Sequence, residues 1–255
     1  MDRVSAPLAA RLRAAGCVFA EEEAALLEAA ASGAELDRLV RRRIAGEPLE
    51  HLLGHVRFDG LRIRVATGVF VPRRRSEALV HAAVRGLRPG AVVVDLCCGC
   101  GAIGLAIARR APVVLHAVDV DPVATACAAG NLAGTGTVHT GDLFAALPES
   151  LRGRVDVVVA NTPYVPAAEI TGLPPEARDH EPRTALDGGA DGLDPARRVA
   201  AAACGWLARG GRVLIETSSD QAPALEAAFE GAGLASRTGH DEERDGTWVE
   251  GTLPH

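Results

Sequence analysis

From about residue 77 onward, short apolar runs rich in valine alternate with longer segments that have helical spacing. Runs of this length, bounded by glycine, proline or polar residues, are typical of buried strands. Strands that alternate with helices form a mostly parallel sheet covered on both faces. The pattern therefore predicts an α/β fold. The expected strands are 91–96, 113–120, 137–143, 155–161 and 210–217, the expected helices are 101–110 and 121–133, and 233–253 is expected to add antiparallel edge strands.

The first 76 residues have a different texture. Residues 5–46 are rich in Ala, Leu, Glu and Arg, with Gly16 and Gly33 as natural stops, which predicts two or three short helices. Residues 56–71 alternate in part and contain Asp59-Gly60, a strong hairpin turn signal. The organisation that follows is a helical module at 1–48, a β-hairpin linker at 49–76 and a larger domain at 77–255.

Composition sets limits on the class of protein. A chain of 255 residues is long enough for one large core with a small appendage. No apolar run approaches the ~20 residues of a membrane span, and the N-terminus lacks the apolar core of a signal peptide. We therefore expect a cytoplasmic protein without a membrane partner. Its six cysteines do not suggest a secreted disulfide framework at this length.

Charge is unevenly distributed along the chain. The net charge is −6. The chain has 27 arginines and no lysine, which excludes chemistry that needs a lysine. Residues 38–75 hold ten arginines against three acidic residues. This excess indicates either a basic face toward an acidic partner or solvated side chains on a helix and a hairpin.

The segment "VVVDLCCGCGAIGLAIA" (92–108) carries the first chemical signal. A strand ends at Asp95, a glycine-containing turn follows, and a helix begins near Gly101. Glycine lets the backbone turn tightly and approach a ligand, while the helix N-terminus faces that ligand. Twenty residues after Gly99 the next strand ends at Asp119, where a carboxylate can hold ribose hydroxyls.

A third strand ends in the same way. "GDL" places Asp142 where a carboxylate can accept from an adenine amino group. Ligands of open α/β sheets bind at this carboxyl edge, so three strands ending in acids predict a nucleoside-containing ligand. The chain has no GxxxxGK[ST] motif and no second glycine-rich or basic element for a pyrophosphate. The pattern therefore favours S-adenosylmethionine over a dinucleotide or ATP.

The fourth strand ends in "NTPY" (161–164), which contains the single tyrosine of the chain. This motif resembles the Asp/Asn-Pro-Pro-Tyr of methyltransferases that act on planar amino or amide nitrogens. Three further segments resemble the HemK/PrmC family of protein-(glutamine-N5) methyltransferases, and the resemblance extends from about 47 to 220. These segments are the linker-like 47–80, "GDLFAALP" (141–148) and "HEPRTALDGGADGLDPARRV" (180–199).

The resemblance implies a class I methyltransferase fold, Rossmann-like, with S-adenosylmethionine as the cofactor and S-adenosylhomocysteine as the product. The implied activity is methylation of a glutamine side-chain amide, and the family's target is the Gly-Gly-Gln motif of peptide-chain release factors. The implied partner is such a protein. The net charge of −6 and the lack of a recognition domain count against stable nucleic-acid binding, and a monomer is expected. No metal is implied.

Residue by residue, the resemblance places the cofactor against the turn, with its ribose on Asp119 and its adenine near Asp142 and Leu143. The target amide would lie on 161–164, with Asn161 also bordering the cofactor. Asn161 and the carbonyl of Thr162 would accept the two N–H groups, and Pro163 and Tyr164 would form a flat wall. Asn161 and Tyr164 are the expected catalytic residues. The turn residues are Cys97, Cys98, Gly99, Cys100 and Gly101.

Three positions depart from the family's usual pattern. Thr162 replaces a proline, the Gly-Thr-Gly turn has become cysteine-rich, and the usual "PRPETE" is "PRRRSE" at 72–77. The cysteines lack the paired CxxC spacing of a zinc site, so we interpret them as small residues in the turn. Three alternative functions stay open: a methyltransferase acting on adenine in nucleic acid, one acting on a small molecule or natural product, and a non-catalytic binding protein.

Overall fold

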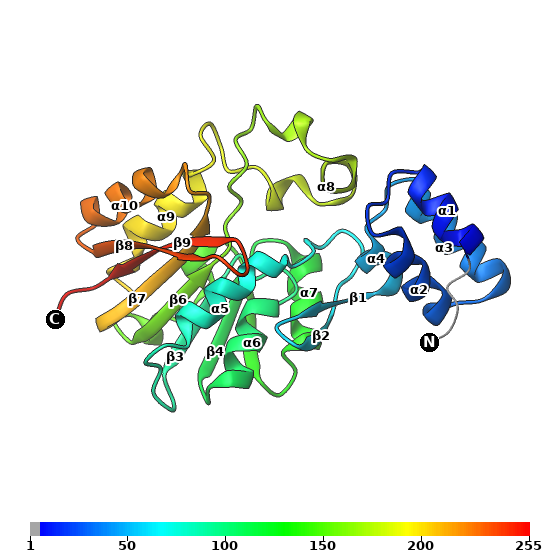
Figure 1. Cartoon of the computed structure of the whole chain (residues 1–255). Coiled ribbons are helices and arrows are strands. Elements are labelled where there is room, and N and C mark those ends of the chain that lie inside the picture. The colour runs from blue at the N-terminus through cyan, green and yellow to red at the C-terminus, as the bar shows by residue number, and fades with distance from the viewer. Residues whose placement is uncertain (1–5) are drawn as a thin grey trace.

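The computed structural model describes residues 6–255 and begins with four helices set beside the main body (Figure 1). They pack around an apolar core of their own, in which Leu12, Leu27 and Val40 are fully buried. Residues 6–46 therefore contain three helices, where two or three were expected, and a fourth short helix lies in the segment expected to be linker. The helices are α1 (Ala6–Ala14), α2 (Ala20–Ala30), α3 (Gly33–Ile44) and α4 (Leu49–Leu53).

An antiparallel hairpin of β1 (His55–Phe58) and β2 (Leu61–Arg64) joins these helices to the rest of the chain. Its turn is Asp59-Gly60, both in the left-handed region with φ of +49° and +76°, the conformation that a two-residue hairpin loop needs. The hairpin is fastened to the body by Asn131, whose side chain accepts from the backbone N–H of Arg64 at 3.0 Å and donates to its carbonyl at 2.9 Å.

The body is a seven-stranded sheet in the order β5-β4-β3-β6-β7-β9-β8. The first five strands in that order are parallel, and β9 and β8 extend the edge in antiparallel fashion. This confirms the predicted α/β fold, including its antiparallel edge. The strands are β3 (Val92–Leu96), β4 (Val114–Asp119), β5 (Gly136–Thr140), β6 (Val155–Ala160), β7 (Leu207–Thr217), β8 (Ala235–Asp241) and β9 (Gly246–Thr252).

Helices cover both faces of the sheet (Figure 1). Val93 and Val157 pack in the core formed with α5 (Glu77–Ala83), α6 (Ala102–Arg110) and α7 (Pro122–Asn131). Their neighbours Val94 and Val158 pack on the opposite face, in the core formed with α9 (Asp194–Ala203) and α10 (Ala222–Gly231). Since both faces are buried, these strands have continuous valine runs rather than alternating polar and apolar positions.

Between β6 and α9, residues 161–193 arch over the carboxyl edge of the sheet and reach the N-terminal helices (Figure 1). Arg43 of α3 contacts Glu176 of this arch at 3.2 Å.

None of the helices within residues 6–255 is long and apolar enough to span a membrane. The arch contains η4 (Ile170–Gly172), α8 (Pro175–His180) and η5 (Arg183–Ala185); other short 3-10 turns are η1 (Arg74–Ser76), η2 (Leu143–Ala146) and η3 (Glu149–Leu151).

Candidate functional site

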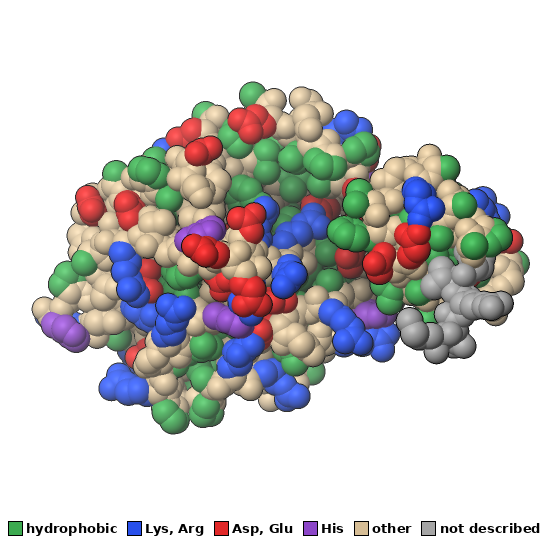
Figure 2. Space-filling model, viewed as in Figure 1, with side chains coloured by type: hydrophobic (Ala, Val, Ile, Leu, Met, Phe, Trp, Pro, Cys, Tyr) green, Lys and Arg blue, Asp and Glu red, His purple; other side chains and the backbone are tan. Residues whose placement is uncertain are grey.

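A cavity of about 520 Å³ opens beneath the arch, at the carboxyl ends of β3, β4 and β6. The chain leaves β3 toward β4 on one side and later returns to β6 on the other, so this is the point where the strand order reverses and ligands of α/β folds bind. Figure 2 shows arginine and apolar side chains around the hollow between the arch, the body and the N-terminal helices. The predicted residues that line the cavity are Cys97, Cys98, Gly99, Cys100, Asp119, Asp142, Leu143, Asn161, Pro163 and Tyr164.

The cysteine-rich turn after β3 forms the floor of this cavity. Cys97 and Gly99 both have φ of +54°, and Gly101 has φ of +78°. A non-glycine residue with positive φ has a strained backbone, so Cys97 is the residue of the turn whose backbone conformation costs free energy. Gly101 does not line the cavity. A Cβ at this position would lie 3.1 Å from the side chain of Leu132, which follows α7.

The three thiols of the turn are held in their neutral form. Burial, reinforced by nearby carboxylates, raises the pKa of Cys97, Cys98 and Cys100. Only a thiolate is a strong nucleophile or metal ligand, so these side chains act as small neutral groups at neutral pH. Among residues 6–255, no group of three or more His, Cys, Asp or Glu is placed to hold a metal ion.

Asp119, at the end of β4, organises the turn from the other side. Its two carboxylate oxygens accept from the backbone N–H of Gly99 at 2.8 Å and from that of Asp121 at 3.0 Å. Burial raises the pKa of Asp119, and these two backbone donors oppose that shift. An ionised carboxylate has about four acceptor positions, so Asp119 can still accept from ligand hydroxyls in the cavity.

Asp142, the expected partner of the adenine, lines the cavity. Its carboxylate pairs with Arg198 of α9 at 2.5 Å, and both side chains are more than half exposed. Arg198 also lines the cavity and was missed from the sequence, because nothing local to α9 marks it. Leu143 follows in the left-handed region, with φ of +47°, and lines the cavity beside Asp142.

The NTPY loop brings the expected catalytic side chains into the same cavity. Asn161 donates from Nδ2 to the Ser76 hydroxyl at 3.3 Å, and among the described residues no group donates to its Oδ1. The carbonyl of Tyr164 accepts from Gln221 at 2.9 Å. Burial raises the pKa of the Tyr164 phenol, so it remains protonated. Thr162 differs: its side chain is only 1% exposed and does not line the cavity, and its hydroxyl has no hydrogen-bond partner among residues 6–255.

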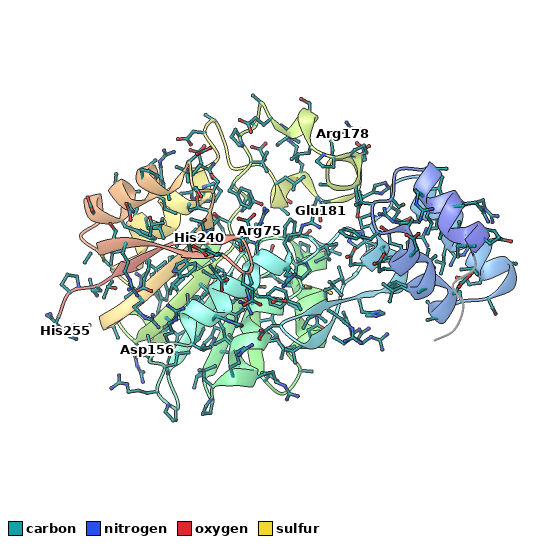
Figure 3. All side chains as sticks on the ribbon, in the orientation of Figure 1. Arg75, Asp156, Arg178, Glu181, His240 and His255 are labelled. Atoms are coloured by element: carbon teal, nitrogen blue, oxygen red, sulfur yellow. The ribbon has the colours of Figure 1, made fainter. Side chains whose placement is uncertain are left out.

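The roof of the cavity comes from the segment after α8. Glu181, labelled in Figure 3, accepts from Arg73 at 2.6 Å and from the backbone of Val71 at 3.3 Å, which fastens the arch to the linker. Pro182 to Ala185 then line the cavity. Glycine is required farther along at Gly192, because a Cβ there would lie 2.2 Å from the carbonyl oxygen of Tyr164.

Two residues that contact this loop, Arg75 and Ser76, were not identified from the sequence, and neither was Glu216, which contacts Arg75. Ser76 and Arg75 come from η1, and Glu216 lies near the end of β7. Arg75 bonds Glu216 at 3.2 Å and also contacts the Tyr164 hydroxyl. The arginines gained in "PRRRSE" were the available signal, but their distance from NTPY along the chain hid the contact.

Comparison with known proteins adds the family. The family model "Methyltransferase small domain" matches residues 61–172. A release factor glutamine methyltransferase of Streptomyces coelicolor is 42% identical over 189 residues, covering 72% of this chain and 67% of the relative. A 4-amino-L-phenylalanine/4-methylamino-L-phenylalanine methyltransferase of Streptomyces pristinaespiralis is 38% identical over 203 residues, covering 76% of this chain and 69% of the relative. In fold, a Pyrococcus furiosus methyltransferase is similar with a TM-score of 0.59 at 14% identity, covering 77% of this chain and 90% of that one.

Proposed function

Because this chain belongs to the HemK/PrmC family of release factor glutamine methyltransferases, we propose that it transfers a methyl group from S-adenosylmethionine to the side-chain amide nitrogen of a glutamine in a peptide-chain release factor. The observation that carries the proposal is the position of Asn161. Its Oδ1 has no donor among residues 6–255, and Asn161 borders the same cavity as residues 97–100 of the turn and Asp119.

The residues of the cavity fit the cofactor. Asp119 has free acceptor positions for ribose hydroxyls, and Asp142 retains a carboxylate oxygen beside its bond to Arg198 for an adenine amino group. Leu143 supplies apolar surface, and the methionine part would lie against residues 97–100 of the turn, which line the cavity. When bound, S-adenosylmethionine supplies an electrophilic methyl group on a sulfonium.

The NTPY loop would prepare the nitrogen that accepts this methyl group. An amide nitrogen is a poor nucleophile because its lone pair is delocalised into the carbonyl group. Asn161 Oδ1 and the carbonyl of Thr162 would accept its two N–H groups, and Pro163 and Tyr164 would confine its plane. These contacts orient the nitrogen and favour its pyramidalisation, so catalysis consists of positioning and electrostatics. The surplus proton leaves after the methyl transfer.

The test is transfer of labelled methyl from S-adenosylmethionine to a release factor that carries Gly-Gly-Gln, with a Gly-Gly-Ala release factor as the matched control. Asn161→Ala should lower kcat roughly 100-fold or more, as expected for a lost oriented hydrogen bond in a water-excluded site, while its calorimetric affinity for the cofactor changes little. Equal losses in kcat and cofactor affinity would mean that Asn161 serves the cofactor instead. No labelling of Gly-Gly-Gln by a cofactor-bound enzyme would remove the release factor as substrate.

A second candidate is favoured by the Streptomyces pristinaespiralis relative, whose name describes an enzyme that methylates an aromatic amine of an amino acid. Such a nitrogen is planar and also carries N–H donors, so the same loop could orient it. Adding 4-amino-L-phenylalanine to the labelled-cofactor assay separates the two. Labelling of this amine with a higher kcat/KM than the release factor would favour the small-molecule function.

A further inference from the structure

Glu216, the penultimate residue of β7, is a buried acid that neither the proposed cofactor site nor the proposed substrate site uses. It is 4% exposed. Burial raises the pKa of Glu216, while the Ser76 hydroxyl and the positive charge of Arg75 lower it. A buried carboxyl is costly unless its partners compensate, and both of its partners reach onward to the NTPY loop.

The first connection runs through Arg75. Its Nε donates to Glu216 Oε1 at 3.2 Å, and its Nη2 contacts the Tyr164 hydroxyl. The guanidinium also lies over the Tyr164 ring, 5.4 Å from the centroid. Arg75, labelled in Figure 3, is 44% exposed in its side chain. A long, half-exposed side chain has several rotamers, so Arg75 can hold the ring in one place only while Glu216 anchors it.

The second connection runs through Ser76, which is 1% exposed. Its Oγ accepts from Asn161 Nδ2 at 3.3 Å, and its hydroxyl lowers the pKa of Glu216, as a nearby donor does. Glu216 Oε2 has no partner within ordinary hydrogen-bond distance among the described residues, so a buried acceptor is left open there. Arg75 already donates to Oε1, and the Ser76 proton is not used in the bond with Asn161, so Oε2 is the acceptor left for that proton.

The direction of these bonds decides which atom of Asn161 meets the substrate. A hydroxyl has one proton to donate. When Ser76 gives that proton to Glu216, its Oγ can only accept, so Asn161 must turn Nδ2 toward Ser76. Oδ1 then remains for the cavity as an acceptor. If Ser76 donated to Asn161 instead, the amide would flip and present N–H groups that repel the N–H groups of a substrate amide.

We propose that Glu216 is a positioning residue that acts through Ser76 and Arg75 to fix Asn161 and Tyr164 for a substrate nitrogen that donates N–H groups. The proposal rests on the proposed function, since it concerns the same loop. On this proposal, Glu216, a residue of β7 outside the NTPY motif, makes the site select a substrate with a planar nitrogen that donates N–H groups. Neither Glu216 nor Ser76 needs to touch the transferred methyl group.

The experiment compares Ser76→Ala with Ser76→Thr in the labelled-methyl assay, with Ser219→Ala as a matched control. Ser219 follows the end of β7 and contacts Thr247 at 3.4 Å instead of the NTPY loop. Ser76→Ala should lower kcat roughly 10- to 100-fold, the scale of a misplaced reacting group, with unchanged cofactor affinity. Ser76→Thr keeps the hydroxyl and should restore most of the activity, and Ser219→Ala should match the wild type.

Glu216→Gln tests the anchor itself. A glutamine amide can donate to Ser76, which frees the Ser76 proton for Asn161, so kcat should fall with little change in the cofactor dissociation constant. If Glu216→Gln does not fold, the Ser76 pair decides alone. An active wild type with Ser76→Ala as active as Ser219→Ala would overturn the positioning role. A cofactor-bound wild type that methylates neither the release factor nor the amine would overturn the proposed function instead.

Discussion

Asp95 carries a pH-dependent penalty on folding that one substitution should remove. It is fully buried at the end of β3. Its Oδ2 accepts from the backbone of Gly104 at 2.8 Å, and its Oδ1 has no partner among residues 6–255. Burial, with a smaller contribution from the charge of Asp119, raises the pKa of Asp95 from 3.8 to about 7, against the lowering effect of the Gly104 N–H.

The sign of the effect follows from linkage. The folded state binds the proton of Asp95 more tightly than the unfolded chain does. The contribution of this bound proton to the free energy of unfolding is therefore complete below pH 3.8 and is lost as the pH rises through about 7. A pKa difference of one unit between the folded and unfolded states corresponds to about 1.4 kcal/mol. The part of the Asp95 difference that lies between pH 5 and about 7 is about two units. Asp95 should therefore cost the wild type about 3 kcal/mol between pH 5 and pH 8.

The perturbation is Asp95→Asn, which keeps the shape and the acceptor for Gly104 but cannot ionise. The assay is thermal unfolding of both proteins at pH 5 and pH 8, since all other titrating groups cancel in the difference. The stability of the variant relative to the wild type should rise by about 3 kcal/mol from pH 5 to pH 8, or roughly 6–12 °C in Tm for a chain of this size.

The matched control is Asp191→Asn on the exposed part of the arch. The hydrogen bond from Arg197 lowers the pKa of Asp191, so this carboxyl does not titrate between pH 5 and pH 8. Its variant should differ from the wild type by the same amount at both values. If Asp95→Asn behaves like this control, the buried carboxyl of Asp95 imposes no pH-dependent cost on folding.

Three further outcomes are expected. Thr162→Val should stabilise the fold by about 1 kcal/mol in urea unfolding, because it removes a buried hydroxyl without a partner; an unchanged midpoint would mean that the hydroxyl is hydrogen-bonded. Asp119→Asn should weaken calorimetric binding of S-adenosylmethionine about tenfold or more, since it exchanges a charged acceptor for an amide; unaltered affinity would remove Asp119 from the cofactor site. Arg43→Ala should cost about 3–5 kcal/mol of unfolding free energy, because it leaves Glu23 buried without its 2.6 Å partner, and adding Glu23→Gln should recover part of that loss; no recovery would show that packing dominates.

Much of the fold was predictable because its signals are local. The valine runs indicated buried strands, and the glycines of the hairpin and of the turn after β3 marked backbone positions with positive φ. The acids that end β3 and β4 and the NTPY motif could be assigned to the carboxyl edge, because parallel strands place their ends together. The short helix α4 was missed, since five residues after Pro48 are too few for a helical period to show.

By itself, the sequence determined the strands, the turns, the family and the residues at the strand ends, because periodicity, turn chemistry and motifs act over a few neighbouring residues. The tertiary structure alone decided which distant residues meet those ends. It placed Ser76 and Glu216 behind Asn161 and paired Asp142 with Arg198. It also turned the Thr162 side chain away from the cavity. These contacts depend on strand order and on the packing of the linker over the sheet, which are global properties that local patterns do not contain.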